Sequence, residues 1–346
     1  MRNYLRVIAA MCMLTLLTAC SGGSEPSADE STIAASTTSP APQAKALEDL
    51  TVGLTYIPDI QFAPFYLADK YGYFTDEGLN VTLRHHGQGE SLFGALASGD
   101  EDVVNAGADE MVQARSQGID VAAFGQLYQT YPVVLIVPED SDIRTLDDLR
   151  GKTIGVPGPF GENWFALLAI LQQAHLTEAD VNIEHIGFTT QAALVTNKVD
   201  AVMGFTNNDV VNFRASDLPV RTFALETNAL QSIAIGAMDE TIAERGEALA
   251  GLRTALARAV RDIQRDPKAA VDDCFDYLPK VSGANKIAQA EAVLTATAKL
   301  YGDEALAIDA SQWPAMVEFM AGAELLDGEV DPVQAVNDLS ELSASR

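Results

Sequence analysis

The sequence predicts an α/β fold in which mostly parallel strands alternate with helices in two lobes. Short apolar runs alternate with stretches of helical spacing, the pattern of repeated βα units. The 300 residues that follow residue 46 have a length typical of two domains rather than one. A middle segment has strands and helices of its own. We therefore expect residues 47–138 and 232–346 to form lobe I and residues 139–231 to form lobe II.

In lobe I, short apolar runs predict strands, and the stretches between them predict helices. The expected strands are residues 50–55, 80–84, 102–106 and 121–126, and the expected helices are residues 64–73, 91–97 and 110–117. A further apolar run, residues 133–138, ends this first part of lobe I. Strands that alternate with helices pair in parallel through right-handed crossovers, so both faces of the sheet should be covered.

The middle segment begins with a short helix, a tight turn at Gly151, a strand over residues 153–156 and a loop rich in Gly and Pro. The remaining expected elements are strands over residues 181–185 and 201–204 and helices over residues 163–174 and 191–196. The run "SIAIGAMDETI" returns to a strand and a helix, and the chain from Ala243 onward predicts one helix after another. Two chain crossings thus bracket lobe II and predict a cleft between the lobes.

The first twenty residues have the features of a bacterial export signal that ends in a lipidated cysteine. Arg2 and Arg6 precede an apolar run over residues 7–17 that is too short for a membrane-spanning helix, and "LTAC" resembles the lipobox. We expect a signal peptide over residues 1–19 and a lipid on Cys20; the alternative is an ordinary secretory cleavage site. Residues 20–46 have the composition of a disordered tether, which would hold an extracytoplasmic body at the membrane.

Processing at Cys20 would remove Cys12 and leave Cys274 as the single unmodified cysteine, so neither a disulfide nor a cysteine-based metal site is expected. It would also remove Arg2 and Arg6, which leaves 20 Lys and Arg against 49 Asp and Glu and a formal charge of −29. Such an acidic chain is a poor partner for nucleic acid. The charge says little about a small ligand.

A loop rich in aromatic residues, "YIPDIQFAPFY" at residues 56–66, follows the first strand. Pro58 and Pro64 each remove a backbone donor and fix φ, which favours a stiff loop at the carboxyl end of that strand. Open α/β sheets bind their ligands at such loops. The alternative is that Phe62, Phe65 and Tyr66 pack inward as part of the core.

Four stretches of the chain carry a family resemblance: "VGLTYIPDIQFAPFYLADKYGYFTDEGLNVTL", "SGDEDVVNAGADEMVQARSQGIDV", "LDDLRGKTIGVPG" and "KVDAVMGFTNNDVV". They resemble the solute-binding proteins of ABC importers in the group that binds thiamine pyrimidine precursors, riboflavin, sulfonates and nitrate. The resemblance covers residues 50–263 and implies a type II periplasmic-binding-protein fold, with two lobes, two crossover segments and a ligand cleft that closes by hinge motion. It also implies an ABC permease and ATPase as partners of a monomeric chain.

Within that group, "YIPDIQFAPFY", "GQLYQTYPVV" and "GFTNNDVV" are most similar to the riboflavin and thiamine-pyrimidine binders. The ligand expected from this resemblance is riboflavin first and a thiamine pyrimidine precursor second. Sulfonate and nitrate fit less well, because the candidate loops carry no Arg or Lys to bind an anion. Helix N-termini at residues 158–161 or 87–91 could still hold an anion through backbone N–H groups.

A flat heterocycle requires aromatic faces for stacking and fixed polar groups along its edge, and the loops supply both. The candidate aromatic contacts are Tyr56, Phe62, Phe65, Tyr128, Tyr131, Phe160, Trp164 and Phe205. The candidate polar contacts are Asp59, Gln61, Asp109, Glu162, Asn163, Asn207 and Asn208. Tyr56, Trp164 and Phe205 are expected to sandwich the ring.

Several of these polar residues have an alternative structural interpretation. Asp109 could cap a helix that starts at Glu110, and Glu162 or Asn163 could cap the helix after Gly161. Asn207 and Asn208 could belong to a turn, because Asn tolerates the left-handed conformation.

The sequence carries little sign of catalysis. Adjacent strand residues such as His85 and His86 point to opposite faces and cannot easily share a metal, so neither a metal nor a cofactor is expected. No nucleophile elbow, P-loop or dinucleotide fingerprint is present. Related thiamine-pyrimidine synthases remain an alternative from another class, but they resemble one another in a cysteine-rich iron-site motif, and here Cys274 stands alone. A sensor partner that binds the same ligand is a third interpretation.

Overall fold

The computed structural model describes residues 46–87, 90–187, 189–226, 229–278, 283–304 and 306–339. The predicted signal peptide, Cys20 and residues 20–45 of the predicted tether lie outside these ranges. The described residues all belong to one compact unit. Among the described residues, every helix is too short or too polar to cross a bilayer.

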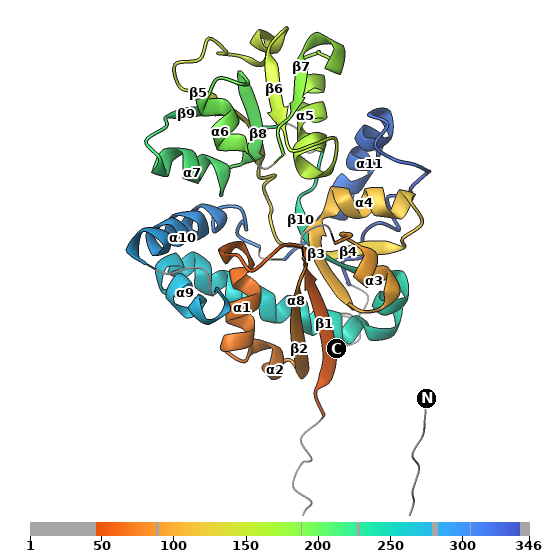
Figure 1. The fold of residues 1–346 in the computed structure, drawn as a ribbon. Coiled ribbons are helices and arrows are strands. Elements are labelled where there is room, and N and C mark those ends of the chain that lie inside the picture. Colours follow the sequence, from red (N-terminus) through yellow and green to blue (C-terminus); the bar gives the residue numbers. More distant parts are fainter. Residues whose placement is uncertain are drawn as a thin grey trace, which may run out of the picture. The chain divides into compact units, whose positions relative to one another are not determined.

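The first sheet is the framework of lobe I (Figure 1). Its strands are β1 (Glu48–Leu54), β2 (Leu79–His85), β3 (Val103–Gly107), β4 (Val121–Gln126) and β10 (Ile233–Met238). They lie in the order β2-β1-β3-β10-β4. β1 pairs in parallel with β2 and β3, whereas β10 runs antiparallel to both β3 and β4.

The second sheet repeats this plan in lobe II. Its strands are β5 (Val133–Pro138), β6 (Thr153–Val156), β7 (Asn182–His185), β8 (Ala201–Phe205) and β9 (Val220–Phe223). They lie in the order β7-β6-β8-β5-β9, with β6 parallel to β7 and β8 and with β5 antiparallel to β8 and β9. In each sheet four of the five strands run in the same direction, as expected of mostly parallel sheets, and the single antiparallel strand is the first one after a crossing.

Helices cover both faces of each sheet, as expected. The helices packed on the first sheet and around it are α1 (Ala63–Lys70), α2 (Tyr73–Asp76), α3 (Gly94–Ser98), α4 (Ala108–Ser116), α8 (Asp239–Arg265), α9 (Pro267–Asp273), α10 (Ala284–Thr297) and α11 (Trp313–Gly322). Those of the second sheet are α5 (Gly161–Gln173), α6 (Thr190–Val195) and α7 (Asp209–Ala215). Phe165 of α5 also packs into the core around α4 and α11, so the lobes share an apolar contact.

The chain crosses between the sheets twice, over residues 127–132 and 224–232. The predicted lobe boundary at Pro138 is wrong for one strand: β5 pairs with β8 and β9 and therefore belongs to the second sheet. Val133 to Val137 form an apolar run that suits a central strand of either sheet, and only its long-range pairing decides between them. β9 was not expected, because Arg221 and Thr222 interrupt its short apolar pattern at the edge of the sheet.

Candidate ligand-binding site

The strand order locates one switch point in each sheet. In the first sheet the chain passes from β1 to β2 on one side and then to β3 on the other, and β6, β7 and β8 repeat this in the second. Loops at the carboxyl ends of β1, β3, β6 and β8 therefore diverge, which is where open α/β sheets bind ligands. The predicted residues on these loops are Tyr56, Asp59, Asp109, Phe160, Glu162, Asn207 and Asn208.

The loop after β1 has a fixed backbone and an exposed aromatic ring. Thr55 Oγ1 donates to the Asn105 carbonyl of β3 at 2.7 Å, and His85 Nδ1 of β2 lies 3.0 Å from the Tyr56 carbonyl oxygen. Asp59 Oδ1 accepts from the Gln61 N–H at 3.1 Å and so caps a short 3-10 helix, Ile60–Phe62. The Tyr56 side chain is 50% exposed.

Three of the predicted aromatic contacts belong to the core instead. Phe65 is fully buried, Phe62 and Tyr128 are almost so, and all three pack in the apolar cluster between the first sheet and α8. Tyr128 lies against Tyr301 with ring centroids 5.7 Å apart. For Phe62 and Phe65 the structure agrees with the alternative that these aromatics pack inward.

Two carboxyl groups occupy the first turn of α4. This helix begins at Ala108, not at Glu110 as the capping interpretation of Asp109 assumed. Glu110 makes the capping contact, since its Oε2 accepts from the Gly107 N–H at 3.0 Å. Asp109 is completely buried; its Oδ1 accepts from the Glu110 N–H at 2.8 Å.

A third carboxyl group approaches from lobe II. Glu162 lies in the first turn of α5, and its Oε1 accepts from Ser232 Oγ at 2.9 Å. The Tyr131 hydroxyl lies 2.8 Å from Asp109 Oδ2 and 3.2 Å from the Glu162 carbonyl oxygen. Tyr131 and Ser232 stand on the two crossings. Asp109, Glu110 and Glu162, which we call the carboxyl cluster, thus lie where the lobes meet.

The protonation of the carboxyl cluster differs from that of ordinary acids. Burial, with the nearby charge of Glu110, raises the pKa of Asp109 well above its usual range, and burial with the charges of Asp109 and Glu110 does the same for Glu162. Burial raises the pKa of Glu110 to about 7. Within the described residues, no Lys or Arg forms a salt bridge with the cluster.

The Tyr131 hydroxyl has two acceptors within reach, Asp109 Oδ2 and the Glu162 carbonyl oxygen. Its one hydrogen therefore bridges the start of α4 and the start of α5.

Asn207 links lobe II to α10. Its side chain is 3% exposed, and its Nδ2 donates to Thr297 Oγ1 at 3.0 Å. Its Oδ1 has no hydrogen-bond partner among the described residues, and the same holds for Oδ1 of the buried Asn105 in β3. Burial and the charges of Glu162 and Asp59 raise the pKa of Tyr128, and the Asn207 amide opposes that shift, so these groups share one neighbourhood.

The remaining predicted residues line the same loops with different exposure. Phe160 precedes α5 and is 57% exposed, whereas Gln61, Asn163, Trp164 and Phe205 are half-buried. Asn208 is exposed and accepts from Asn212 Nδ2 at 2.8 Å, a local contact at the start of α7. Sequence reasoning missed Asn105, Glu110 and Ser232; only Asn105 carries a signal, since it is a polar residue within an apolar strand.

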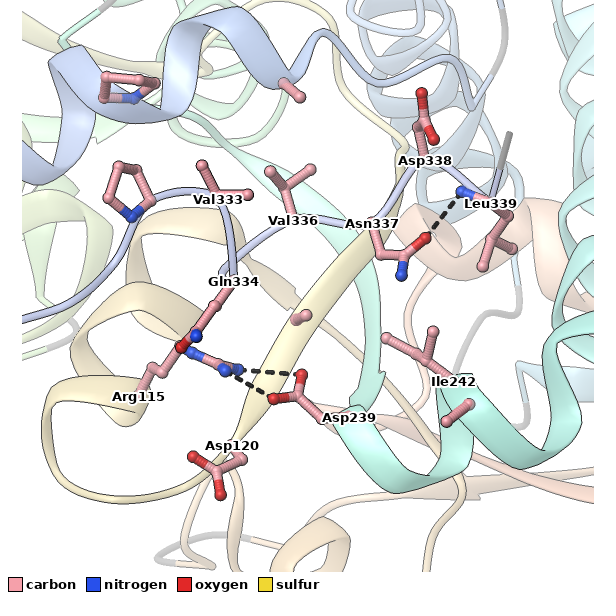
Figure 2. Close-up of a pocket in the computed structure, with 15 residues that line it drawn as sticks. Arg115, Asp120, Asp239, Ile242, Val333, Gln334, Val336, Asn337, Asp338 and Leu339 are labelled. Atoms are coloured by element: carbon pink, nitrogen blue, oxygen red, sulfur yellow. Dashed lines mark hydrogen bonds and ion pairs between the residues drawn. The ribbon is translucent and has the colours of Figure 1, made fainter. Parts of the chain in front are cut away.

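A separate pocket of about 940 Å³ lies at the other edge of the first sheet (Figure 2). Its walls come from the end of α4, the start of α8 and the segment around Val336, and Arg115 pairs with Asp239 inside it. Asp120 directly precedes β4, so this is the amino edge of the parallel strands. None of the predicted site residues lines this pocket. Among the described residues, no cluster of three or more His, Cys, Asp or Glu is suited to a metal ion.

Comparisons with known proteins agree with this architecture. The chain is 32% identical over 343 residues to the riboflavin-binding protein RibY of Chloroflexus aurantiacus, which covers 96% of each chain. It is 25% identical over 231 residues to the 4-amino-5-hydroxymethyl-2-methylpyrimidine phosphate synthase of Aspergillus parasiticus, covering 63% of this chain and 67% of that one.

Among solved structures, the periplasmic aliphatic sulphonate binding protein SsuA of Escherichia coli matches with a TM-score of 0.66 at 17% identity, over 84% of this chain and 92% of that one. This likeness confirms the expected periplasmic-binding-protein fold. The model of the family described as NMT1/THI5 like matches residues 59–270. The chain therefore belongs to the NMT1/THI5-like family.

Proposed function

We propose that this chain is the substrate-binding component of an ABC importer and that it captures a flat, vitamin-like heterocycle, riboflavin in the first place. The observation that carries the proposal is an exposed aromatic ring on the switch-point loop of each lobe, Tyr56 at 50% and Phe160 at 57% exposure. Exposed aromatics on stiff loops suit a ring that stacks. The 32% sequence identity to the riboflavin-binding protein RibY, over nearly the whole of both chains, supports the choice of ligand.

The polar groups nearby suit a ligand that donates hydrogen bonds. Buried amide oxygens of Asn105 and Asn207 lack partners among the described residues, and an unpaired buried acceptor is costly until a donor reaches it. Isoalloxazine and aminopyrimidine rings both carry N–H donors at their edges. A thiamine pyrimidine precursor is therefore the second ligand in our proposal.

An anion fits the site less well. The four switch-point loops and the first turns of the helices after them contain Asp59, Asp109, Glu110, Glu162 and Asp209 but no Lys or Arg. A sulfonate or nitrate would have to approach these carboxyl groups with only backbone N–H groups to bind it.

An enzymatic role has one specific observation in its favour, the similarity to a pyrimidine phosphate synthase. Thiol chemistry is disfavoured within the described residues. Their single cysteine, Cys274, is fully buried, and burial raises its pKa to about 12, so it is not a reactive thiolate. The rest of the proposed role, with export, a lipid on Cys20, and a permease and ATPase as partners, follows from the leader sequence and the family resemblance.

The test is a ligand screen on the purified full-length chain in detergent. Riboflavin at a hundredfold excess over its Kd should stabilise the chain by about 2.7 kcal/mol, a rise of several degrees in Tm, and its fluorescence should be quenched. Hydroxymethylpyrimidine, formylaminopyrimidine, thiamine, taurine and nitrate complete the panel. A response to a pyrimidine alone would change the ligand, and a response to taurine or nitrate alone would overturn the proposal.

A further inference from the structure

We propose that His85 is a positioning residue that, as the neutral tautomer with its proton on Nδ1, holds the loop that presents Tyr56 to the ligand. The inference rests on the proposed function where it concerns ligand affinity. Its structural part, the tautomer and the anchored loop, stands independently of any ligand.

Two contacts define the state of the imidazole. Nδ1 lies 3.0 Å from the Tyr56 carbonyl oxygen, and Nε2 lies 3.0 Å from the Tyr66 hydroxyl. A carbonyl oxygen only accepts, so Nδ1 must carry the hydrogen. In a neutral ring Nε2 is then an acceptor, and Tyr66 donates to it. Both bonds are satisfied together by this one tautomer.

The surroundings keep both partners in these roles. Tyr66 is fully buried and stacks on Tyr277 with ring centroids 4.7 Å apart, and burial strongly raises the pKa of its hydroxyl, which therefore remains a donor. Burial lowers the pKa of His85, which favours the neutral ring. The Phe62 ring packs against the imidazole in a T-shaped contact, with centroids 5.5 Å apart.

The Tyr56 loop is thereby anchored to both neighbours of β1. Thr55 is bonded to β3 through the Asn105 carbonyl, and the next residue, Tyr56, is bonded to β2 through His85. The ring of Tyr56 remains half-exposed while its backbone is held in place. A contact that is ordered before the ligand arrives loses less entropy on binding, so this anchoring should raise affinity.

The adjacent histidine has a different role, as expected for neighbours in a strand. His86 is buried, and its Nε2 lies 2.9 Å from Glu101 Oε1. The strand register provides a matched control in lobe II. Leu54 of β1 is opposite His85 of β2, and Val156 of β6 is opposite His185 of β7. His185 is exposed, and no hydrogen bond of its side chain is found within the described residues.

The first measurement is independent of ligand. Nitrogen-15 shifts of the wild-type imidazole should show the Nδ1–H tautomer of His85. Hydrogen exchange over residues 55–62 should accelerate at least severalfold in His85→Gln, whose amide reaches only the Nε2 position, and stay near wild type in His85→Asn, whose amide can replace Nδ1–H. An Nε2–H tautomer, or equal exchange in both variants, would overturn the anchor.

The second measurement is the Kd for riboflavin in the full-length chain. Loss of one hydrogen bond that orders the loop should weaken binding roughly tenfold in His85→Gln. His85→Asn and the control His185→Ala should stay within about twofold of wild type. Equal weakening in the Asn and Gln variants would contradict the positioning role. If the wild-type chain does not bind riboflavin, the proposed function fails, and the tautomer and exchange data still decide for or against the anchor.

Discussion

The two sheets of this protein share one strand plan but present different chemistry at their ends. β1, β2, β3, β10 and β4 correspond in position and direction to β6, β7, β8, β5 and β9. After β3, lobe I places Asp109 and Glu110, whereas after β8 lobe II places Asn207 and Asn208. Common topology thus determines where ligand contacts can stand, and the local sequence determines what they are.

The same contrast exists beneath the loops. At the end of β2, the buried Glu101 contacts both the buried His86 and the partly exposed Arg84. The equivalent end of β7 carries the exposed His185. Lobe I therefore has fixed polar contacts at this end of its sheet. Lobe II has a loop rich in Gly and Pro, and the exposed Phe160 ends that loop directly before α5. The predictions below test this difference.

The largest expected effect comes from two equivalent glycines. A Cβ on Gly53 of β1 would lie 2.1 Å from Oε2 of the buried Glu101, and a Cβ on Gly155 of β6 would lie 2.8 Å from the Ile186 methyl group. Gly53→Ala should cost about 2–3 kcal/mol because it displaces the buried Glu101 carboxylate from its partners, whereas Gly155→Ala should cost about 1–2 kcal/mol of overpacking. Urea unfolding of both variants measures the difference. If both variants lost the same free energy of unfolding, the Glu101 side chain would be able to move away from the new methyl group as easily as Ile186 does.

The next effect concerns binding. If the exposed rings of both lobes stack on the ligand, Tyr56→Ala and Phe160→Ala should each weaken riboflavin binding by about 1–3 kcal/mol. Fluorescence titration gives these values. Tyr71→Ala, another exposed tyrosine whose hydroxyl bonds to Asp273, is the control and should leave the Kd unchanged. A loss confined to one lobe would mean that the ring lies on that lobe alone.

The third effect is a pH dependence of stability to which the carboxyl cluster contributes. Its acids have raised pKa values, so the folded chain binds more protons than the unfolded chain and stability falls as pH rises. For Glu110 the fall should lie between its ordinary pKa near 4.5 and about 7, and a shift of this size corresponds to at most about 3 kcal/mol.

Glu110→Gln should flatten the pH profile of Tm over this window, while Glu178→Gln, at an exposed position of lobe II, should leave the profile unchanged. A profile in which Glu110→Gln follows the wild type would mean that the cluster titrates like exposed acids.

The elements of this fold were predictable where the signal was local. Nine of the ten strands found in the described residues coincide with expected strands, most of them because a buried strand needs a run of apolar residues. The assignment of β5 to lobe I was wrong because its apolar residues would suit either sheet. Only its pairing with β8, some 70 residues further along the chain, determines that it belongs to the second sheet. β9 lacks the signal altogether, since its edge position tolerates Arg221 and Thr222.

The positions of the loops that carry the candidate residues were predictable, but the exposure of their side chains was not. Strand ends indicated the loops that carry Tyr56, Asp109, Phe160 and Asn207. Whether a loop aromatic faces solvent or core depends on what packs above it, which explains why Tyr56 is exposed and Phe65 is buried. The sequence placed Glu110 only at the start of a helix, and the approach of Gly161 in α5, where an added Cβ would lie 3.2 Å from Glu110 Oε1, brings this half-buried residue into the cluster.

The pairing of β4 with β10, which are separated in the sequence by the whole of lobe II, has a consequence for how the chain folds. In the first sheet β4 pairs with β10, whose residues 233–238 follow the whole of lobe II, and it forms single bridges to Val336 and Leu306, which come later still. The strands of the second sheet, by contrast, are contiguous over residues 133–223. We therefore expect lobe II to fold before lobe I is complete during synthesis, because β4 cannot pair with β10 until β10 has been made. Long-range strand pairing of this kind is slow. Until it forms, the edge of β4 stays unpaired and prone to aggregation, which chaperones can prevent.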